Sequence, residues 1–108
     1  MIYETRIYET LPGKMPNLHA RFREHTIDIF ERHGMKNIGY WTSSVGEYTD
    51  RLTYMMAYED AGHREKAWES FTKDPEWNKV RSESEADGPI LKRVFNNLLV
   101  PTDYSPLQ

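Results

Sequence analysis

The sequence contains no cysteine among its 108 residues. This absence excludes disulfide frameworks, thiolate metal sites, cysteine nucleophiles and dithiol redox chemistry. Long apolar runs are missing too: the densest one, residues 54–58, has the length of a strand, whereas a membrane-spanning helix needs about 20 apolar residues. The N-terminus carries charged residues and no signal-peptide apolar block. Together these absences favour a protein of the reducing cytoplasm with no membrane insertion.

Basic residues are not in excess either. Lys and Arg total 14 against 17 Asp and Glu, a formal net charge of −3, so the electrostatic footprint of a nucleic-acid-binding protein is absent. The sequence has no glycine-rich phosphate loop and no Gly-x-Ser-x-Gly elbow. No two of the four histidines are spaced i, i+4, and no thiol is present to complete a zinc site. We therefore expect neither a metal nor another cofactor.

Four segments rich in β-branched and aromatic residues predict strands. They cover residues 2–9, 36–44, 51–59 and 90–100. In the third segment both alternating sets of side chains are largely apolar: Leu52, Tyr54, Met56 and Tyr58 on one face, Thr53, Met55 and Ala57 on the other. A strand that is apolar on both faces needs cover on both.

Helical spacing of apolar residues predicts a helix between the first two strands. The recurring residues are Met15, Leu18, Phe22 and Ile29. Pro16 fits the first turn of this helix and Gly34 ends it. A second helical region begins after Asp60 as N-cap. It restarts at Asp74 and Pro75, an N-cap followed by a proline at the first helical position.

The resulting β-α-β-β-α-β order predicts an α+β, ferredoxin-like fold. This fold has a four-stranded antiparallel sheet, two helices on one face, and the first and third strands at the centre. The domain covers residues 1–101, and residues 102–108 are expected to form an extended C-terminal tail. Because helices cover only one face, we expect the bare faces of two copies to pack together as a homodimer.

Several short motifs follow one another along the chain. They are Glu4-x-Arg6-x-Tyr8, Pro12-Gly13-Lys14, Glu31-Arg32-His33-Gly34, Gly39-Tyr40-Trp41, Ala57-Tyr58-Glu59-Asp60, Asp74-Pro75-Glu76-Trp77 and Leu99-Val100-Pro101. Their order and spacing over residues 2–101 resemble those of NIPSNAP-family domains. That family belongs to the dimeric α/β-barrel superfamily, so the resemblance also implies a homodimer. Its small members are mostly uncharacterised, and neighbouring families include cofactor-independent monooxygenases.

His25 is the first candidate for chemistry. It falls on the apolar stripe between Phe22 and Ile29, so we expect its side chain to point toward the sheet. An imidazole in that place is either a general base or ligand, or a core histidine with both nitrogens hydrogen-bonded. The structural alternative is the simpler one.

Glu4, Arg6 and Tyr8 are two residues apart on a strand and therefore share a face. On a central strand we expect a partner to bury that face. The three then either bind a carboxylate or enol, with Arg6 orienting it and Glu4 as base or clamp, or Glu4 and Arg6 of opposite chains form a salt bridge that fixes dimer register. The second alternative is favoured, because fixing register is the best-attested use of buried charges.

Aromatic residues form the third group of candidates. Tyr40, Trp41, Tyr54 and Tyr58 lie on strands, and their hydroxyl groups need partners where they are buried. Most such residues belong to the core, but the hydroxyl groups can also hold a small planar ligand. We therefore expect either a small-molecule or partner-binding protein, or a monooxygenase-like enzyme. The enzyme would act on a small aromatic or enolisable compound near His25, with Tyr58 or Arg6.

Overall fold

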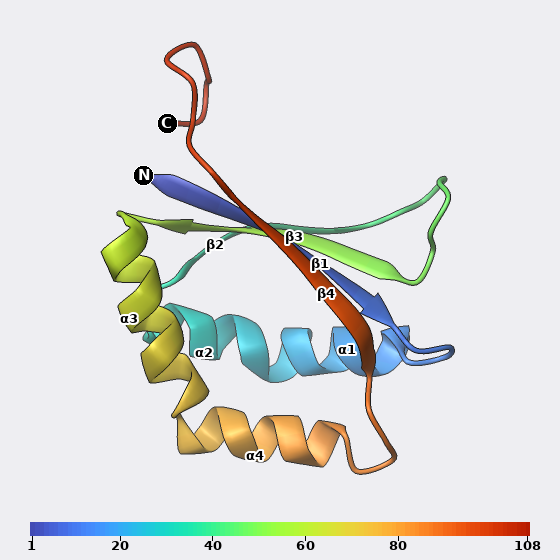
Figure 1. Ribbon diagram of the computed structural model, residues 1–108. Helices are drawn as coiled ribbons and strands as arrows, with labels where there is room; N and C mark the ends of the chain where they lie inside the picture. Colours follow the sequence, from blue (N-terminus) through green and yellow to red (C-terminus); the bar gives the residue numbers. More distant parts are fainter.

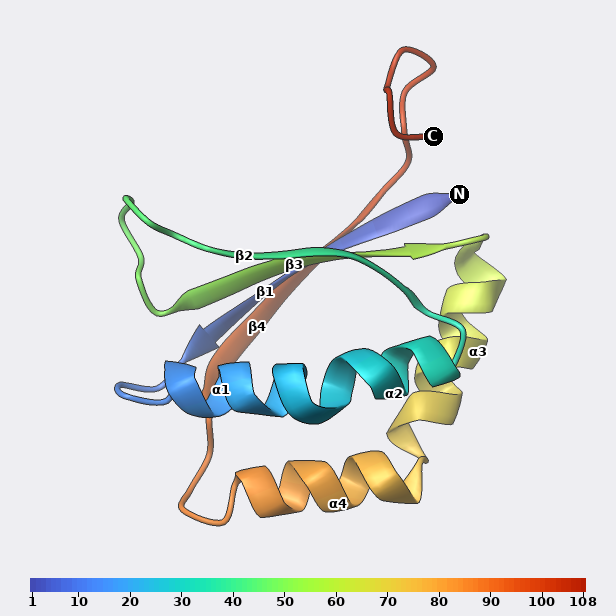
Figure 2. The ribbon, with the colours of Figure 1, turned by 180° about the vertical axis from the view of Figure 1, so that it is seen from behind.

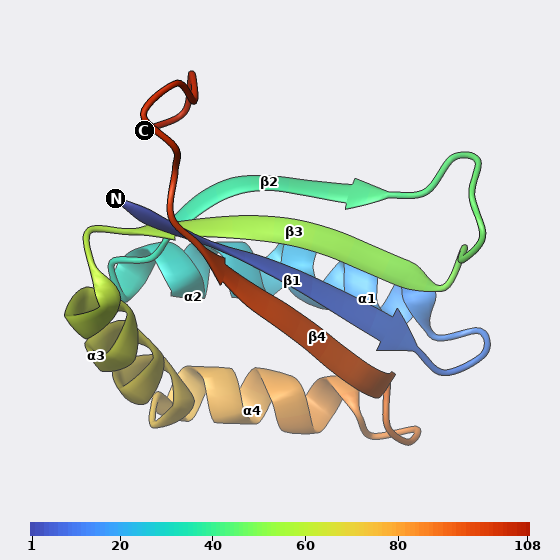
Figure 3. The same cartoon turned by 45° about the horizontal axis from the view of Figure 1, so that its top comes forward.

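Four antiparallel strands form one sheet in the spatial order β2-β3-β1-β4. The strands are β1 (Ile2–Thr10), β2 (Lys36–Thr42), β3 (Arg51–Tyr58) and β4 (Leu91–Leu99). The structure, a computed structural model, describes residues 1–108. Figure 3 shows β1 and β3 at the centre of the sheet. The expected ferredoxin-like order and the central place of the first and third strands are confirmed.

All helices lie on one side of this sheet, as Figures 1 and 2 show from opposite directions. The first helical region comprises α1 (Met15–Arg21), a π-helical turn η1 (Phe22–Thr26) and α2 (Ile27–Arg32). The second comprises α3 (Ala61–Thr72) and α4 (Pro75–Ser84). None of these helices has the length and hydrophobicity needed to cross a bilayer.

The π-turn η1 changes which side chains of the first helical region face the sheet. The Ile27 N–H donates to the carbonyl of Phe22, five residues earlier. This wider turn places Thr26 in the buried position, 1% exposed, and its hydroxyl donates to the Arg21 carbonyl at 3.2 Å. His25 is exposed instead. The expected inward placement of His25 is therefore wrong, because an even 3.6-residue period does not hold through a π-turn.

Capping fixes where α3 and α4 begin. The Asp60 side chain accepts a hydrogen bond from the His63 N–H at 2.7 Å, and Asp74 accepts one from the Glu76 N–H at 2.8 Å. Pro75 occupies the first turn of α4, where its missing N–H costs nothing. Both expected N-caps are confirmed. The chain bends sharply between α3 and α4 (Figure 1).

Asp74 also binds the end of α2. Its Oδ2 lies 2.6 Å from His33 Nε2 and 2.5 Å from Arg32 Nη2, while His33 Nδ1 lies 2.6 Å from Ser70 Oγ. Hydrogen bonds from these side chains lower the pKa of Asp74. One carboxylate therefore holds α2 against the junction of α3 and α4.

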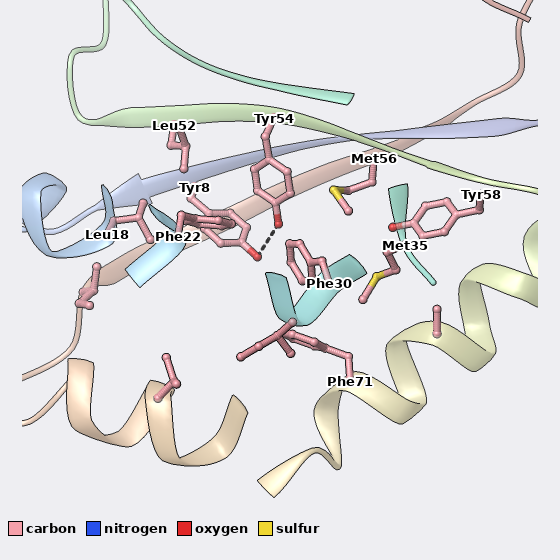
Figure 4. Packing of buried hydrophobic residues seen from close by; sticks show 14 residues of the cluster. Tyr8, Leu18, Phe22, Phe30, Met35, Leu52, Tyr54, Met56, Tyr58 and Phe71 are labelled. Carbon is pink, nitrogen blue, oxygen red and sulfur yellow. Dashed lines mark hydrogen bonds between the residues drawn. The ribbon is translucent and has the colours of Figure 1, made fainter. Parts of the chain in front are cut away.

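The helix-covered face of the sheet contains the core. Figure 4 shows Tyr54 pointing from β3 toward Phe30, and Phe71 of α3 packs beside Phe30. The ring centroids of Phe30 and Phe71 are 4.8 Å apart. Leu52 and Met56, on the same face of β3, are also buried. The aromatic residues of the sheet and of both helical regions thus form one cluster.

Glu4, Arg6 and Tyr8 lie on this covered face too, which corrects the expectation that a partner buries them. Their partners in register on β3 are Met56, Tyr54 and Leu52, and residues directly opposite in an antiparallel pair share a face. Glu4 pairs with Arg6 of its own chain at 3.0 Å. The period of two showed that the three side chains share a face but not which face.

The opposite face of the sheet has no helix over it (Figures 1 and 2). Ile7 and Met55 lie there on the two central strands, and Trp41 and Phe95 lie there on the edge strands β2 and β4, as the strand register shows. Trp41 is 54% exposed and Phe95 37%. We call this surface the open face.

The C-terminal tail turns back on itself, which corrects the expectation of an extended segment. The Gln108 side-chain amide donates to the carbonyls of Thr102 and Ser105. The Tyr3 hydroxyl donates to the Gln108 carbonyl at 2.6 Å. Figure 1 shows the loop that results beside the N-terminus. Backbone and side-chain hydrogen bonds thus close the tail against β1.

The π-turn yields a first prediction. We expect His25→Ala to change the free energy of unfolding by no more than about 0.5 kcal/mol, because an exposed side chain far from special features contributes little. Ile29→Ala should lower it by about 3 kcal/mol, since it removes buried methyl groups and leaves a cavity. Chemical denaturation of both variants measures the difference. A loss for His25→Ala as large as for Ile29→Ala would contradict the register described above.

Candidate ligand-binding cavity

A cavity of about 350 Å³ lies between the sheet and the helices. Six aromatic side chains form most of its wall: Tyr8, Phe22, Phe30, Trp68, Phe71 and Trp77. They come from β1 and from both helical regions, and Phe71 and Trp77 place the cavity beside the bend between α3 and α4. A volume of this size, apolar with a few polar groups, is typical of small-molecule sites.

Charged side chains gather at one part of this wall. Arg21, Arg81 and Glu85 line it together. The Arg21 side chain is 4% exposed, and its Nη1 lies 3.8 Å from Glu85 Oε1 and 3.4 Å from Ser84 Oγ. Its Cζ lies 5.4 Å from the centroid of the Trp77 ring. Burial lowers the pKa of Arg21, and both polar contacts are long for so buried a charge.

Behind the cavity, Glu4 is the centre of a hydrogen-bond network. Its carboxylate is 0% exposed and accepts bonds from Arg6 (3.0 Å), Tyr58 (2.7 Å), Arg64 (2.8 and 3.1 Å) and Asn96 (2.9 Å). Burial alone would raise the pKa of Glu4, but these hydrogen bonds and the charge of Arg6 lower it to about 2. A buried carboxylate with this many donors is fully satisfied.

Arg6 links this network to the cavity wall. Its Nε donates to the Tyr54 hydroxyl at 2.8 Å, its Nη2 to the Tyr8 hydroxyl at 3.2 Å, and its Cζ lies 4.5 Å from the Trp68 ring centroid. The two tyrosine hydroxyls are 2.8 Å apart (Figure 4). They hold two protons and share one hydrogen bond, so one proton has no protein acceptor. Because Tyr54 donates this bond, the proton without an acceptor belongs to Tyr8, which lines the cavity.

The structure brings together five of the eight predicted site residues. Glu4, Arg6, Tyr8, Tyr54 and Tyr58 belong to one network, and of these only Tyr8 lines the cavity. Burial raises the pKa values of Tyr54 and Tyr58. Their phenols are therefore protonated at neutral pH and act as hydrogen-bond donors, not as bases.

His25, Tyr40 and Trp41 lie elsewhere. His25 lines a separate outer groove of about 280 Å³ beside α4. Tyr40 stacks on Tyr54 with ring centroids 5.0 Å apart, at the opposite side of the core, and burial raises its pKa. Trp41 projects from the open face. The expected pocket near His25 that would combine it with Tyr58 or Arg6 is not found, because η1 turns His25 away from the sheet.

Arg21, Trp68 and Trp77 line the cavity but were not among the predicted site residues. The sequence of α4 could have pointed to Arg21. This helix has few apolar residues other than Trp77 and Val80, so a polar residue of the first helical region is expected to face it. A helix so polar cannot cover the first helical region with apolar contacts alone. No group of three or more His, Asp or Glu residues lies close enough together to hold a metal ion.

The Glu4 network yields a pH-dependent prediction. The shift from 4.5 to about 2 corresponds to about 3 kcal/mol of stability. Because the folded-state pKa is the lower one, this contribution is present above pH 4.5 and is lost as the pH falls toward 2. We expect Glu4→Gln to lower the free energy of unfolding at pH 7 by about 3 kcal/mol.

Urea titrations of wild type and variant across this pH range measure the effect, and the two curves should converge in acid. Glu65→Gln, an exposed change on α3, is the control and should follow the wild type. A constant difference between wild type and Glu4→Gln at every pH would contradict the ionised, buried carboxylate.

Comparisons with known proteins agree with the motifs. The NIPSNAP family model matches residues 3–106. The mouse protein NipSnap homolog 3B is 31% identical over 75 residues, which cover 69% of this chain and 30% of the mouse protein. A NIPSNAP family protein from Agrobacterium tumefaciens has the same fold with a TM-score of 0.87 and 27% identity, over 99% of this chain and 98% of that one.

A more distant likeness concerns the fold alone. A cofactor-independent oxygenase from Streptomyces nogalater superposes with a TM-score of 0.63 and 10% identity, over 97% of this chain and 96% of the other. The family match, by contrast, covers nearly every element described above. The chain belongs to the NIPSNAP family.

Proposed function

We propose that the protein binds a small molecule with a flat apolar ring in the cavity between its helices and its sheet. The observation that carries this proposal is the aromatic lining of a space of about 350 Å³, with Arg21 and the Tyr8 hydroxyl in its wall. Trp68 and Trp77 provide broad ring surfaces for stacking. The Glu4 network holds the wall in place, so the site is largely formed before a ligand arrives.

Binding without catalysis suits this cavity better than an oxygenase reaction. A cofactor-independent oxygenase must hold a phenol and remove its proton. None of the four histidines lines the cavity, and Arg6 and Tyr58 are engaged by Glu4 and its neighbours. The lining therefore offers hydrogen-bond donors but no set of nucleophile, base and orienting group.

A homodimer formed through the open face is part of the same proposal. Trp41, Phe95 and Leu99 are large apolar side chains on that face, between 37% and 54% exposed. Contiguous exposed apolar surface is typical of interfaces, and a two-fold pairing of identical sheets would cover both copies at once. The cavity lies on the other side of each sheet, so pairing leaves it free.

Ligand binding is tested with the three tryptophans as reporters. Adding the neutral probe 2-naphthylmethanol should shift the indole N–H resonances of Trp68 and Trp77, which line the cavity, and leave that of Trp41 in place. Heteronuclear NMR of labelled protein records all three. Thr72→Phe should abolish the shifts, because Thr72 lines the cavity from the end of α3 and a large ring there fills the space.

Lys66→Phe is the matched control, since Lys66 is exposed on the same helix and lines no cavity. It should bind as the wild type does. Equal shifts of all three indoles, or unaltered binding by Thr72→Phe, would show that the probe does not enter the cavity.

Dimer formation is tested by sedimentation. We expect the wild type to sediment at twice the 12.8 kDa chain mass and Phe95→Lys at the mass of one chain, because a buried lysine without a partner disfavours the pairing. Val94→Lys is the matched control: Val94 is 43% exposed against 37% for Phe95, but it pairs with Tyr8 and so lies on the other face of β4. A wild type that sediments as a monomer at micromolar concentration would overturn the proposal.

A further inference from the structure

Arg21 has more hydrogen-bond donors than the chain satisfies. Its Nε is buried and has no hydrogen-bond partner, the one such side-chain atom in the structure. Both polar contacts of the guanidinium, to Ser84 and Glu85, go through Nη1. The edge formed by Nε–H and Nη2–H therefore makes no hydrogen bond within the chain.

A buried, under-satisfied guanidinium is costly. Removing a charge from water is compensated only when opposite charge and hydrogen bonds replace the water. Here the nearest carboxylate oxygen, on Glu85, is 3.8 Å away, beyond hydrogen-bond distance. The Arg21 Cζ lies 5.4 Å from the Trp77 ring centroid, and this cation–π contact does not satisfy the free N–H groups. The Arg21 guanidinium therefore lacks an acceptor for its unpaired N–H groups, and a planar acceptor would match them.

We propose that the ligand is a planar organic carboxylate, whose oxygens pair with the guanidinium of Arg21 while its ring lies among the aromatic residues of the cavity. This inference rests on the proposed small-molecule site and specifies its chemistry. An arginine edge and a carboxylate match in geometry as a two-bond pair.

The other polar groups of the wall agree with an anion. The available Tyr8 proton is a further donor. Arg81 adds a second positive charge among the lining residues, against the single negative charge of Glu85. Glu85 is partly exposed, so its carboxylate is the one group that competes with the ligand for Arg21.

The test compares two probes with the same ring. Calorimetric titration should show 2-naphthoate binding at least about tenfold more tightly than neutral 2-naphthylmethanol, since one charge-assisted pair contributes upward of 1.4 kcal/mol. Arg21→Met should remove this preference, because 2-naphthoate loses its charge-assisted pair. Arg23→Met, on the same turn but exposed and outside the cavity, should keep the preference.

Stability separates a binding role for Arg21 from a structural one. Because methionine fills similar volume without a buried charge, Arg21→Met should unfold at the same urea concentration as the wild type or a higher one. A marked loss of stability with the preference retained would overturn the proposal. Glu85→Gln gives a second readout: it should raise the affinity for 2-naphthoate and not for the alcohol, because it removes the competing carboxylate.

The experiments distinguish failure of the carboxylate proposal from failure of the proposed small-molecule function. If both probes bind the wild type equally, the carboxylate proposal is wrong while the cavity remains a binding site. If neither probe binds and no tryptophan resonance shifts, the small-molecule function itself is wrong.

Discussion

The structure depends on one buried carboxylate. Glu4 lies on β1 and is bonded by side chains from every neighbouring element: Arg6 on β1, Tyr58 on β3, Arg64 on α3 and Asn96 on β4. A carboxylate without these donors would be strongly unfavourable in the core. The network therefore fixes α3 against the sheet, and with it the position of the bend from which α4 departs.

The cavity lies beside that bend. Asp74 caps α4, binds Arg32 and His33 at the end of α2, and thereby holds α4 beside the first helical region. The space that remains near β1 is bordered by Trp68 and Trp77, whose rings belong to helices of different direction (Figure 1). Two polar anchors, Glu4 and Asp74, thus position an apolar wall. Rigid walls lower the cost of ordering a ligand.

Arg21 differs from these anchors because its donors are not satisfied. Glu4 and Asp74 each bind several partners at 2.5–3.1 Å, as structural charges in folded proteins do. Arg21 is as buried as many core residues and has only two long contacts through one nitrogen. Buried polar groups without intramolecular partners are common at binding sites, where they lower the stability of the free protein.

The sequence by itself determined the order of the strands and helices, the N-caps at Asp60 and Asp74, and the family. Local patterns suffice for these, because alternation, helical spacing and capping act over a few residues. It also showed that Glu4, Arg6 and Tyr8 share a face. Only the tertiary structure decided which face that is, because strand alternation is symmetric with respect to the two sides of a sheet.

The candidate site was decided in the same way. A regular helical period predicts that His25 faces the sheet. The π-turn η1 places Thr26 at that buried position instead, and His25 is exposed. Arg21 faces the cavity because α4, more than fifty residues away along the chain, packs beside it. Such a placement results from the packing of distant elements, which no local pattern contains.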